Sequence, residues 1–382
     1  MGKKILSLLL AAVMFLSVTA CGASESGAAA GNMTAENTGN GIKIAIVSSP
    51  AGVDDHSFNE DNYNGILAFI ESHPGAAVTP VQETTGDTEA AIAAVAEILG
   101  NYNVIVCCGF QFAGISEIAR KNPNVKFILV DTFPSDADGN EVEVDNIFAM
   151  CFAEQESGFF AGMAAALETT TGKVAVVNGV AYPSNVNYQY GYECGVKYVN
   201  GTEGKNVEII ELPAYAGTDV TGADVGGNYI GSFADIETGK VIGEALIAED
   251  VDVIFTAAGT AGSGVLQAVK EANGVWYIGC DIDQYDDGAD GNRNVMLTSA
   301  IKVMHRDVER TLNAISVGFF GGGNVTLQAD TGSTGYVSTE GRNQLSAGTI
   351  EKMDAAYELL MLGDIVPAAN FNGITPDTFT WK

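Results

Sequence analysis

From residue 42 onward, short apolar runs typical of β-strands alternate with segments whose apolar residues recur at helical spacing. The run 42–47 is almost continuously apolar, as expected for a parallel strand covered on both faces. In the segment 87–99, the positions Ile92, Val95 and Ile98 share one face of a predicted helix. Because strands and helices alternate in this way, the sequence predicts an α/β fold with parallel sheets.

The alternation runs in two cycles, the second of which begins near residue 147. Segments after residue 295 are too few for a third lobe, so they are expected to complete the first two. The sequence therefore predicts two Rossmann-like lobes with parallel sheets, joined by a hinge that the chain crosses several times. We expect residues 42–149 with about 300–323 in the first lobe, and residues 150–299 with about 324–382 in the second.

The first 41 residues are predicted to lie outside the fold. Lys3 and Lys4 precede an apolar stretch that is too short to span a bilayer, which is typical of a secretory signal peptide over residues 1–20. The run ending at Cys21 resembles a bacterial lipobox, which predicts lipidation of this cysteine; the alternative is an ordinary signal peptide with a chance cysteine. Residues 21–41 are rich in small and polar residues and read as a flexible tether. We therefore expect a lipid-anchored protein on the extracytoplasmic face of the cell membrane.

Charge and composition exclude some functions. The formal net charge of −30 argues against binding a nucleic acid polymer, which requires Lys and Arg to neutralise phosphates. Five cysteines remain beyond Cys21, an odd number without a disulfide framework. With three histidines and no CxxC motif, no metal site and no cofactor are expected.

Polar or small residues stand where the predicted strands end, which is where open α/β sheets bind ligands. These positions are Ser48 and Ser49, Gly109, Asp131, Asn178 and Gly179, Gly259, and Asp281. Strand ends that meet solvent are also polar, and this alternative accounts for some of them. Asp131 and Asp281 each end a hydrophobic strand directly and are the stronger candidates.

Five stretches, spread in order along residues 42–382, resemble the basic membrane protein family of substrate-binding lipoproteins, whose best-understood members are purine-nucleoside receptors. They are residues 54–59; 109–112 with 122–123 and 127–131; 154–162; 188–195; and 279–284 with 298–302. The resemblance implies a type I periplasmic-binding-protein fold with two lobes, a hinge and a closing cleft. It also implies a solute-binding role for an ABC importer, with a membrane permease as partner.

The resemblance assigns roles to individual side chains. Phe58 and Tyr188 fall where the family stacks rings on the two faces of the base. The other implied ligand contacts are Asn59 and Asp131 at the base edge, Gly259, Asp281 and Lys302 at the ribose, and Asp55 in the acidic loop after the first strand. Stacking contributes about 1–3 kcal/mol per base, and charged hydrogen bonds suit ribose hydroxyls. Two positions depart from the family, since His56 replaces a lysine and Tyr188 stands where Phe is common.

Other functions fit the sequence less well. Asp54 and Asp55 superficially resemble the calcium motif of nucleoside hydrolases, but the other ligands and a GxSxG elbow are missing, so the chain is not expected to be an enzyme. The glycine-rich run 259–264 does not have dinucleotide-binding spacing, and the acidic run 281–286 lacks the glycine of a calcium loop. Two alternatives stay open: binding of a sugar or another small polar solute, and a sensor or adhesin role for a surface lipoprotein.

Overall fold

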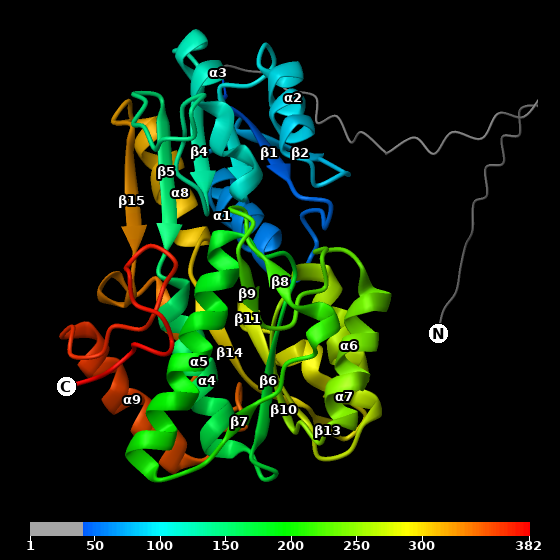
Figure 1. Cartoon of the computed structure of the whole chain (residues 1–382). Coiled ribbons are helices and arrows are strands. Elements are labelled where there is room, and N and C mark those ends of the chain that lie inside the picture. Colours follow the sequence, from blue (N-terminus) through cyan, green and yellow to red (C-terminus); the bar gives the residue numbers. More distant parts are fainter. Residues whose placement is uncertain (1–40) are drawn as a thin grey trace, which may run out of the picture. The chain divides into compact units, whose positions relative to one another are not determined.

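Two six-stranded β-sheets, each with helices on both faces, organise the chain (Figure 1). The computed structural model describes residues 41–382. All neighbouring strands of the first sheet are parallel. In spatial order, its strands are β15 (Gly323–Leu327), β5 (Ile147–Phe152), β4 (Lys126–Val130), β3 (Val104–Cys108), β1 (Lys43–Ser48) and β2 (Ala77–Gln82).

The second sheet is parallel except at one edge, where β16 runs antiparallel to β14. Its strands, in spatial order, are β16 (Thr334–Tyr336), β14 (Met296–Lys302), β11 (Trp276–Asp281), β10 (Val253–Ala257), β6 (Lys173–Asn178) and β7 (Glu208–Ile209). Two further antiparallel pairs lie outside these sheets: β8 (Gly217–Thr218) with β9 (Asp224–Gly226), and β12 (Ala289–Asp290) with β13 (Arg293–Asn294).

Helices cover both faces of each sheet, which explains why the central strands are largely apolar and buried. In β1, Ile44 and Ile46 pack with α1 (Phe58–Ser72) and α8 (His305–Ser316), whereas Ala45 and Val47 pack on the opposite face. The helices of that opposite face are α2 (Thr88–Ile98) and α3 (Ser116–Lys121). The second sheet lies between α4 (Glu154–Glu168), α5 (Pro183–Glu203) and α9 (Ala347–Met361) on one side and α6 (Ile236–Ala248) and α7 (Gly262–Glu271) on the other.

The chain passes between the lobes three times, after β5, after β14 and after β15. The predicted architecture of two parallel-sheet lobes with a multi-crossing hinge is therefore confirmed. The expected division of the sequence differs in one respect. Residues from about 324 on were assigned to the second lobe, but β15 pairs in parallel with β5 in the first sheet. Nothing in this short strand tells which of two similar sheet edges it joins.

Two elements near the N-terminus were not predicted. Strand β2 contains Pro80, which a central strand does not tolerate, and β2 occupies the edge of the sheet. No helix was predicted directly after the acidic loop, but α1 begins there at Phe58. The many polar residues in the first turns of this helix obscured its apolar face, which packs through Ile66 and Phe69. The predicted signal peptide, Cys21 and nearly all of the predicted tether lie outside the described residues.

Glycines allow α4 and α5 to approach each other closely. A Cβ atom added to Gly158 would lie 2.3 Å from the carbonyl oxygen of Tyr188, and one added to Gly162 would lie 2.1 Å from that of Tyr192. The contact is reciprocal, because a Cβ on Gly191 would lie 2.1 Å from the carbonyl oxygen of Gln155. The backbones therefore pack directly, and this brings the first turn of α4 close to Tyr188.

We predict that Gly162→Ala destabilises the protein. The added methyl group forces two backbones apart, which costs about 1–3 kcal/mol of unfolding free energy, less a gain in helix propensity of roughly 1 kcal/mol. Urea unfolding measures the difference. Gly114→Ala is the matched control, because no atom lies within 4 Å of its added Cβ. Equal stability of the two variants would contradict the close backbone packing.

Candidate functional site

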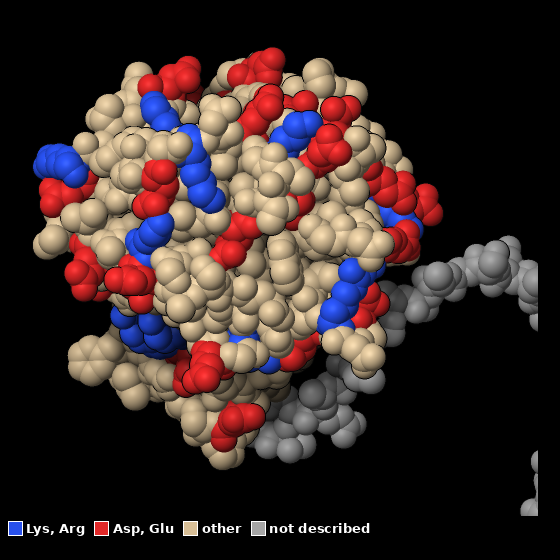
Figure 2. Space-filling model, turned by 90° about the horizontal axis from the view of Figure 1, so that it is seen from below, with Lys and Arg blue, Asp and Glu red and all other residues tan. Residues whose placement is uncertain are grey.

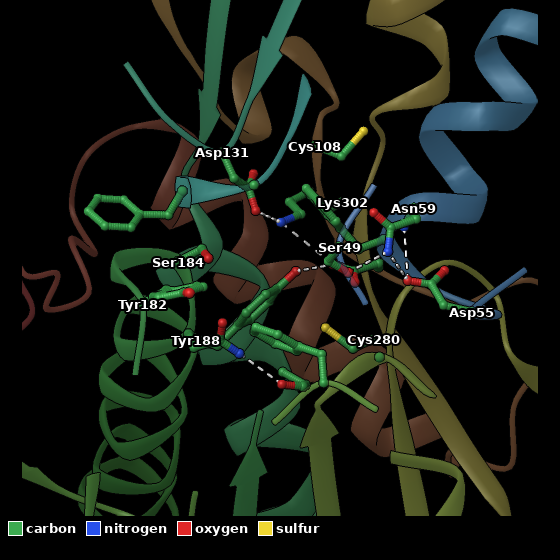
Figure 3. A pocket seen from close by; sticks show the side chains of 18 of the residues that line it. Ser49, Asp55, Asn59, Cys108, Asp131, Tyr182, Ser184, Tyr188, Cys280 and Lys302 are labelled. Carbon is green, nitrogen blue, oxygen red and sulfur yellow. Dashed lines mark hydrogen bonds and ion pairs between the residues drawn. The ribbon is translucent and has the colours of Figure 1, made fainter. Parts of the chain in front are cut away.

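A cavity lies between the two lobes, where the carboxyl ends of their central strands meet (Figure 3). It contains about 560 Å³ of atom-free space, including open solvent at its mouth. All the ligand-binding residues that were predicted from the sequence line this one cavity. They are Asp55, Phe58, Asn59, Asp131, Tyr188, Gly259, Asp281 and Lys302.

The centre of the site is the ammonium group of Lys302, at the end of β14. Its Nζ lies 2.6 Å from Asp131 Oδ2, 3.6 Å from Glu154 Oε1 and 3.7 Å from Asp281 Oδ1. These side chains are 2% to 9% exposed, so the ion pairs are shielded from water. Figure 3 shows Asp131 and Lys302 pointing toward each other from opposite lobes.

Neighbouring carboxyl groups keep the side chain of Lys302 protonated. Burial lowers the pKa of Lys302, but the carboxyl groups of Asp131, Asp281 and Glu154 outweigh this effect and raise its pKa above the usual value. The lysine therefore stays positively charged at every physiological pH. It is the cation that makes the burial of the surrounding carboxylates possible.

Asp131 and Asp281 adopt an unusual backbone conformation at the ends of β4 and β11. Their φ angles are 63° and 68°, in the left-handed region that non-glycine residues rarely occupy. Such strain persists where the surrounding structure enforces it and is concentrated at functional sites. Here the sharp turn follows a buried strand in each lobe, and it places both carboxyl groups beside the same ammonium.

Asp55 fixes the N-terminal turn of α1 and the orientation of Asn59. Its carboxylate accepts hydrogen bonds from the backbone N–H groups of Ser57, Asn59 and Glu60, at 3.0 to 3.1 Å. Burial raises the pKa of Asp55 to about 6, although these backbone hydrogen bonds oppose the shift. Asn59 Nδ2 also donates to Asp55 Oδ2, at 2.8 Å, so the amide oxygen of Asn59 must point the other way. That oxygen is buried and has no hydrogen-bond partner among the described residues.

The two rings expected to stack on a ligand both lie near the lysine. The Nζ atom of Lys302 is 4.8 Å from the ring centroid of Phe58 and 5.6 Å from that of Tyr188, within cation–π distance. Tyr188 is 2% exposed, and its hydroxyl donates to Asp281 Oδ1 at 3.0 Å. This bond supplies the partner that a buried tyrosine hydroxyl requires. It also gives Tyr188 a direct role in holding Asp281.

Three further aromatic residues line the cavity and were not predicted as ligand contacts. Phe110, from the first lobe, lies 5.4 Å from Tyr182 of the second lobe, and Tyr182 lies 6.0 Å from Phe233, measured between ring centroids. The Phe233 ring packs over Gly179, where a Cβ would approach it to 2.3 Å. Phe110 follows a predicted strand and was detectable from the sequence. Phe233 precedes α6 without a strand before it and carried no signal. Glu154 begins the stretch 154–162 that resembles the family, but it was not singled out as a site residue.

Similarity to known proteins shows which family this chain belongs to. A family model described as "ABC transporter substrate-binding protein PnrA-like" matches residues 42–210 and 221–365. The chain belongs to this family. It is 30% identical over 316 residues to basic membrane protein A1 of Borrelia garinii subsp. bavariensis, covering 82% of this chain and 79% of that protein. It is 28% identical over 302 residues to the ABC transporter nucleoside-binding protein BmpA of Lactococcus lactis subsp. cremoris, covering 74% and 78%.

Solved structures agree with the type I periplasmic-binding-protein fold. An ABC transporter solute-binding protein from Aeropyrum pernix K1 superposes with a TM-score of 0.72 at 22% identity, covering 88% of this chain and 96% of that one. At this identity the likeness concerns the fold alone. Family membership and fold together establish a solute-binding role in an ABC transport system, with a small-molecule ligand and a permease partner.

Local ion pairs link some of the acidic side chains on the surface of this chain to basic ones. Arg342 Nε contacts Asp283 at 2.7 Å and its Nη1 contacts Asp286 at 2.8 Å, so two acidic residues of the run after β11 are paired with one arginine. Within residues 41–382, no group of three or more His, Cys, Asp or Glu side chains is arranged to hold a metal ion, and no helix is long and apolar enough to span a membrane. Figure 2 shows acidic and basic side chains interspersed on one face of the molecule.

We predict that Lys302→Met destabilises the protein in a pH-dependent manner. Removing the ammonium leaves three buried carboxyl groups without a cation, which costs about 3–5 kcal/mol. The loss should be larger at pH 8 than at pH 5, because protonation relieves the carboxylates in acid. Urea unfolding at both pH values tests this. Lys121→Met, which removes a lysine that is 75% exposed, is the control. An equal loss at both pH values would argue against the charge-based explanation.

Proposed function

We propose that this chain is the extracytoplasmic receptor of an ABC importer and that it captures purine nucleosides in the interlobe cavity. The observation that carries this proposal is the combination, within one cavity, of aromatic rings with a buried lysine and carboxylate cluster. A nucleoside has a flat aromatic base for the rings and vicinal hydroxyl groups for the charged residues. The relative from Lactococcus lactis carries a name that describes nucleoside binding, which supports the same ligand class.

In this proposal the base stacks on Phe58, and Phe233 covers the second face. Tyr188 was expected there, but its ring is buried and its hydroxyl is bonded to Asp281, so a contributing role at the edge of the stack suits it better. Asn59 Oδ1 and Asp131 Oδ1 are buried acceptors. Asn59 Oδ1 receives no hydrogen bond from the described chain, and Asp131 Oδ1 receives none from Lys302, which binds Oδ2, so each has a lone pair for a ligand. A ligand that brings donors to this edge therefore removes an unfavourable desolvation.

The ribose is assigned to the other end of the site, beside Asp281, Lys302 and Gly259. Asp281 accepts from Tyr188 and, at 2.6 Å, from Ser57 Oγ, and a carboxylate has further lone pairs for a ribose hydroxyl. Gly259 has a φ of 53°, a conformation that favours glycine, and its lack of a side chain leaves its backbone open to the ligand. The excess of carboxyl groups over ammonium groups favours a neutral nucleoside over a phosphorylated nucleotide.

Contacts between the lobes support a closing mechanism. Ser57 Oγ and Asp131 of the first lobe bind Asp281 and Lys302 of the second, and Gln284 Nε2 donates to the carbonyl oxygen of His56 at 2.8 Å. These contacts exist only when the lobes are together. Ligand that touches both lobes would shift the population toward the closed form, which then docks on the permease.

Binding of a sugar is the second candidate. Sugar hydroxyl groups would also satisfy the free acceptors of Asn59 and Asp131, and sugar sites use aromatic rings as well. The nucleoside is preferred because Phe58, Phe110, Tyr182 and Phe233 together provide more ring surface than one sugar needs. A sensor or adhesin role would use the same binding site. Deleting the permease would distinguish such a role from transport, because only transport requires the permease.

We predict that residues 22–382, unfolded and refolded to remove bound ligand, bind purine nucleosides with sub-micromolar affinity in isothermal titration. Inosine and guanosine present an N–H group at the base edge, whereas adenosine presents an acceptor nitrogen there. They should therefore bind more tightly than adenosine, by about 1–3 kcal/mol for an acceptor left unpaired. Uridine, ribose and galactose complete the panel.

The titration separates the candidates. Binding of galactose with silence from every nucleoside would overturn the nucleoside assignment and leave the solute-binding role intact.

Asp281→Ala should weaken nucleoside binding by about 2–4 kcal/mol, from loss of a charged and buried hydrogen bond. If that variant bound as tightly as the parent, the ribose would lie elsewhere.

We further predict that Cys21 anchors the protein to the cell membrane. The full-length chain expressed in bacteria should fractionate with membranes and carry a lipid mass increment on its N-terminal peptide after processing. Cys21→Ser should release the protein from the membrane fraction without changing nucleoside binding. A processed chain without the lipid mass would contradict the anchor.

A further inference from the structure

Glu154 is the member of the Lys302 cluster that neither the sequence nor the proposed ligand contacts explain. It is the first residue of α4, directly after the first crossing between the lobes. Its side chain is 3% exposed, Oε1 lies 3.6 Å from Lys302 Nζ, and Oε2 accepts a hydrogen bond from Asn187 Nδ2 at 3.3 Å. Its ionised form is stabilised by its own backbone N–H, whereas the carboxylate of Asp55 accepts hydrogen bonds from three backbone N–H groups.

The cluster contains more acid than base. Asp131, Glu154 and Asp281 share a single ammonium, and all four side chains are at least nine-tenths buried. Three ionised carboxylates around one lysine leave two uncompensated negative charges in a poorly solvated space. Under such conditions one carboxyl group retains its proton. Glu154 and Asp281 form the two longer ion pairs with Lys302, so one of them is expected to hold the proton. The ionised form of Asp281 is stabilised by hydrogen bonds from both Tyr188 and Ser57, which leaves Glu154.

We propose that Glu154 is a positioning residue for the ligand site, which holds a proton and donates it in a hydrogen bond to Asp131 when the lobes close. The neutral acid then supports Asp131 and Lys302 in the geometry that meets the ligand, without adding a third negative charge. The choice of a nucleoside for the binding test rests on the proposed function, whereas the protonation of Glu154 does not depend on it.

The surroundings of Glu154 agree with this role. Burial, followed by the charge of Asp131, raises the pKa of Glu154 to about 8, and a hydrogen bond from Glu154 helps to stabilise the ionised form of Asp131. The titratable or charged groups that face it from other elements are Asp131 after β4, Cys151 on β5, Tyr188 on α5, Asp281 on β11 and Lys302 on β14. Lys302 is the one cation among these groups.

The sign of the pH effect follows from which lobe carries each group. Glu154, Lys302 and Asp281 belong to the second lobe, and Asp131 belongs to the first. Opening the cleft separates Asp131 from Glu154 and admits water, so the pKa of Glu154 falls toward its usual value. Closure therefore takes up a proton, and the closed form loses stability as pH rises toward about 8, with no further loss above that value.

Isothermal titration with adenosine tests the proposal, because the adenine base carries no group that titrates between pH 6.5 and 8.5. Affinity of the parent protein should fall across this range by about tenfold, below the limit of tenfold per pH unit for one proton. Titration at pH 7.5 in phosphate and in Tris, which differ in ionisation enthalpy, should reveal proton uptake on binding. Glu154→Gln keeps the size and a hydrogen-bond donor, so it should bind well, take up no proton and lose the pH dependence.

Glu156→Gln is the matched control. Glu156 lies two residues further along α4, is also buried and also has a raised pKa, but it binds Ala329 N and Thr334 Oγ1 away from the cluster. This variant should keep the parent's pH profile. Binding without proton uptake in the parent, or an unchanged pH profile in Glu154→Gln, would overturn the proposal.

Unfolding provides a test that needs no ligand. The melting temperature of Glu154→Gln, relative to the parent, should rise between pH 5 and pH 8 and level off above pH 8. The reason is that only the parent releases a proton from residue 154 when it unfolds in this range. If no nucleoside binds but this difference appears, the proposed ligand is wrong and the proton is real. If the difference is absent, the proposal about Glu154 fails whatever the ligand.

Discussion

The buried ammonium group of Lys302 is the interaction on which the site and the joining of the lobes depend. It stands at the end of β14, where the chain leaves the second lobe, and its shortest contact reaches Asp131 of the first lobe. Without this cation, the carboxylates of Asp131 and Asp281 could not be buried together as ions. One side chain therefore connects the folding of the hinge with the chemistry of the cavity.

The first turn of α4 ties the three crossings of the hinge together. Glu154 reaches Lys302 at the second crossing, and Ser157 Oγ donates to the carbonyl oxygen of Ile301 at 2.7 Å. Glu156 accepts a hydrogen bond from Ala329 N at 2.8 Å, at the third crossing. The three segments are thus held together by buried polar groups of a single helical turn.

The cavity combines rigid and mobile attachments in a way that suits capture and release. Asp131 and Asp281 are fixed by strained turns at the ends of central strands, and Asn59 is fixed by Asp55. The hydrogen bonds that Ser57, Asp131 and Gln284 make across the lobes each link a loop or strand end of one lobe to the other. Rigid recognition elements on two separable lobes give selectivity without preventing opening.

The sequence by itself determined the class of fold and the identity of the central ligand-binding candidates. Alternating strand and helix patterns, with polar residues at the strand ends, were enough to select Asp131 and Asp281, because the carboxyl ends of parallel strands face a common crevice. Lys302 was implied by the resemblance to the family. Only tertiary structure decided that β15 joins the first sheet, that Phe233 enters the cavity and that Glu154 reaches Lys302. These features depend on which sheet edge and which loop meet across the cleft, and such long-range contacts leave no local pattern in the sequence.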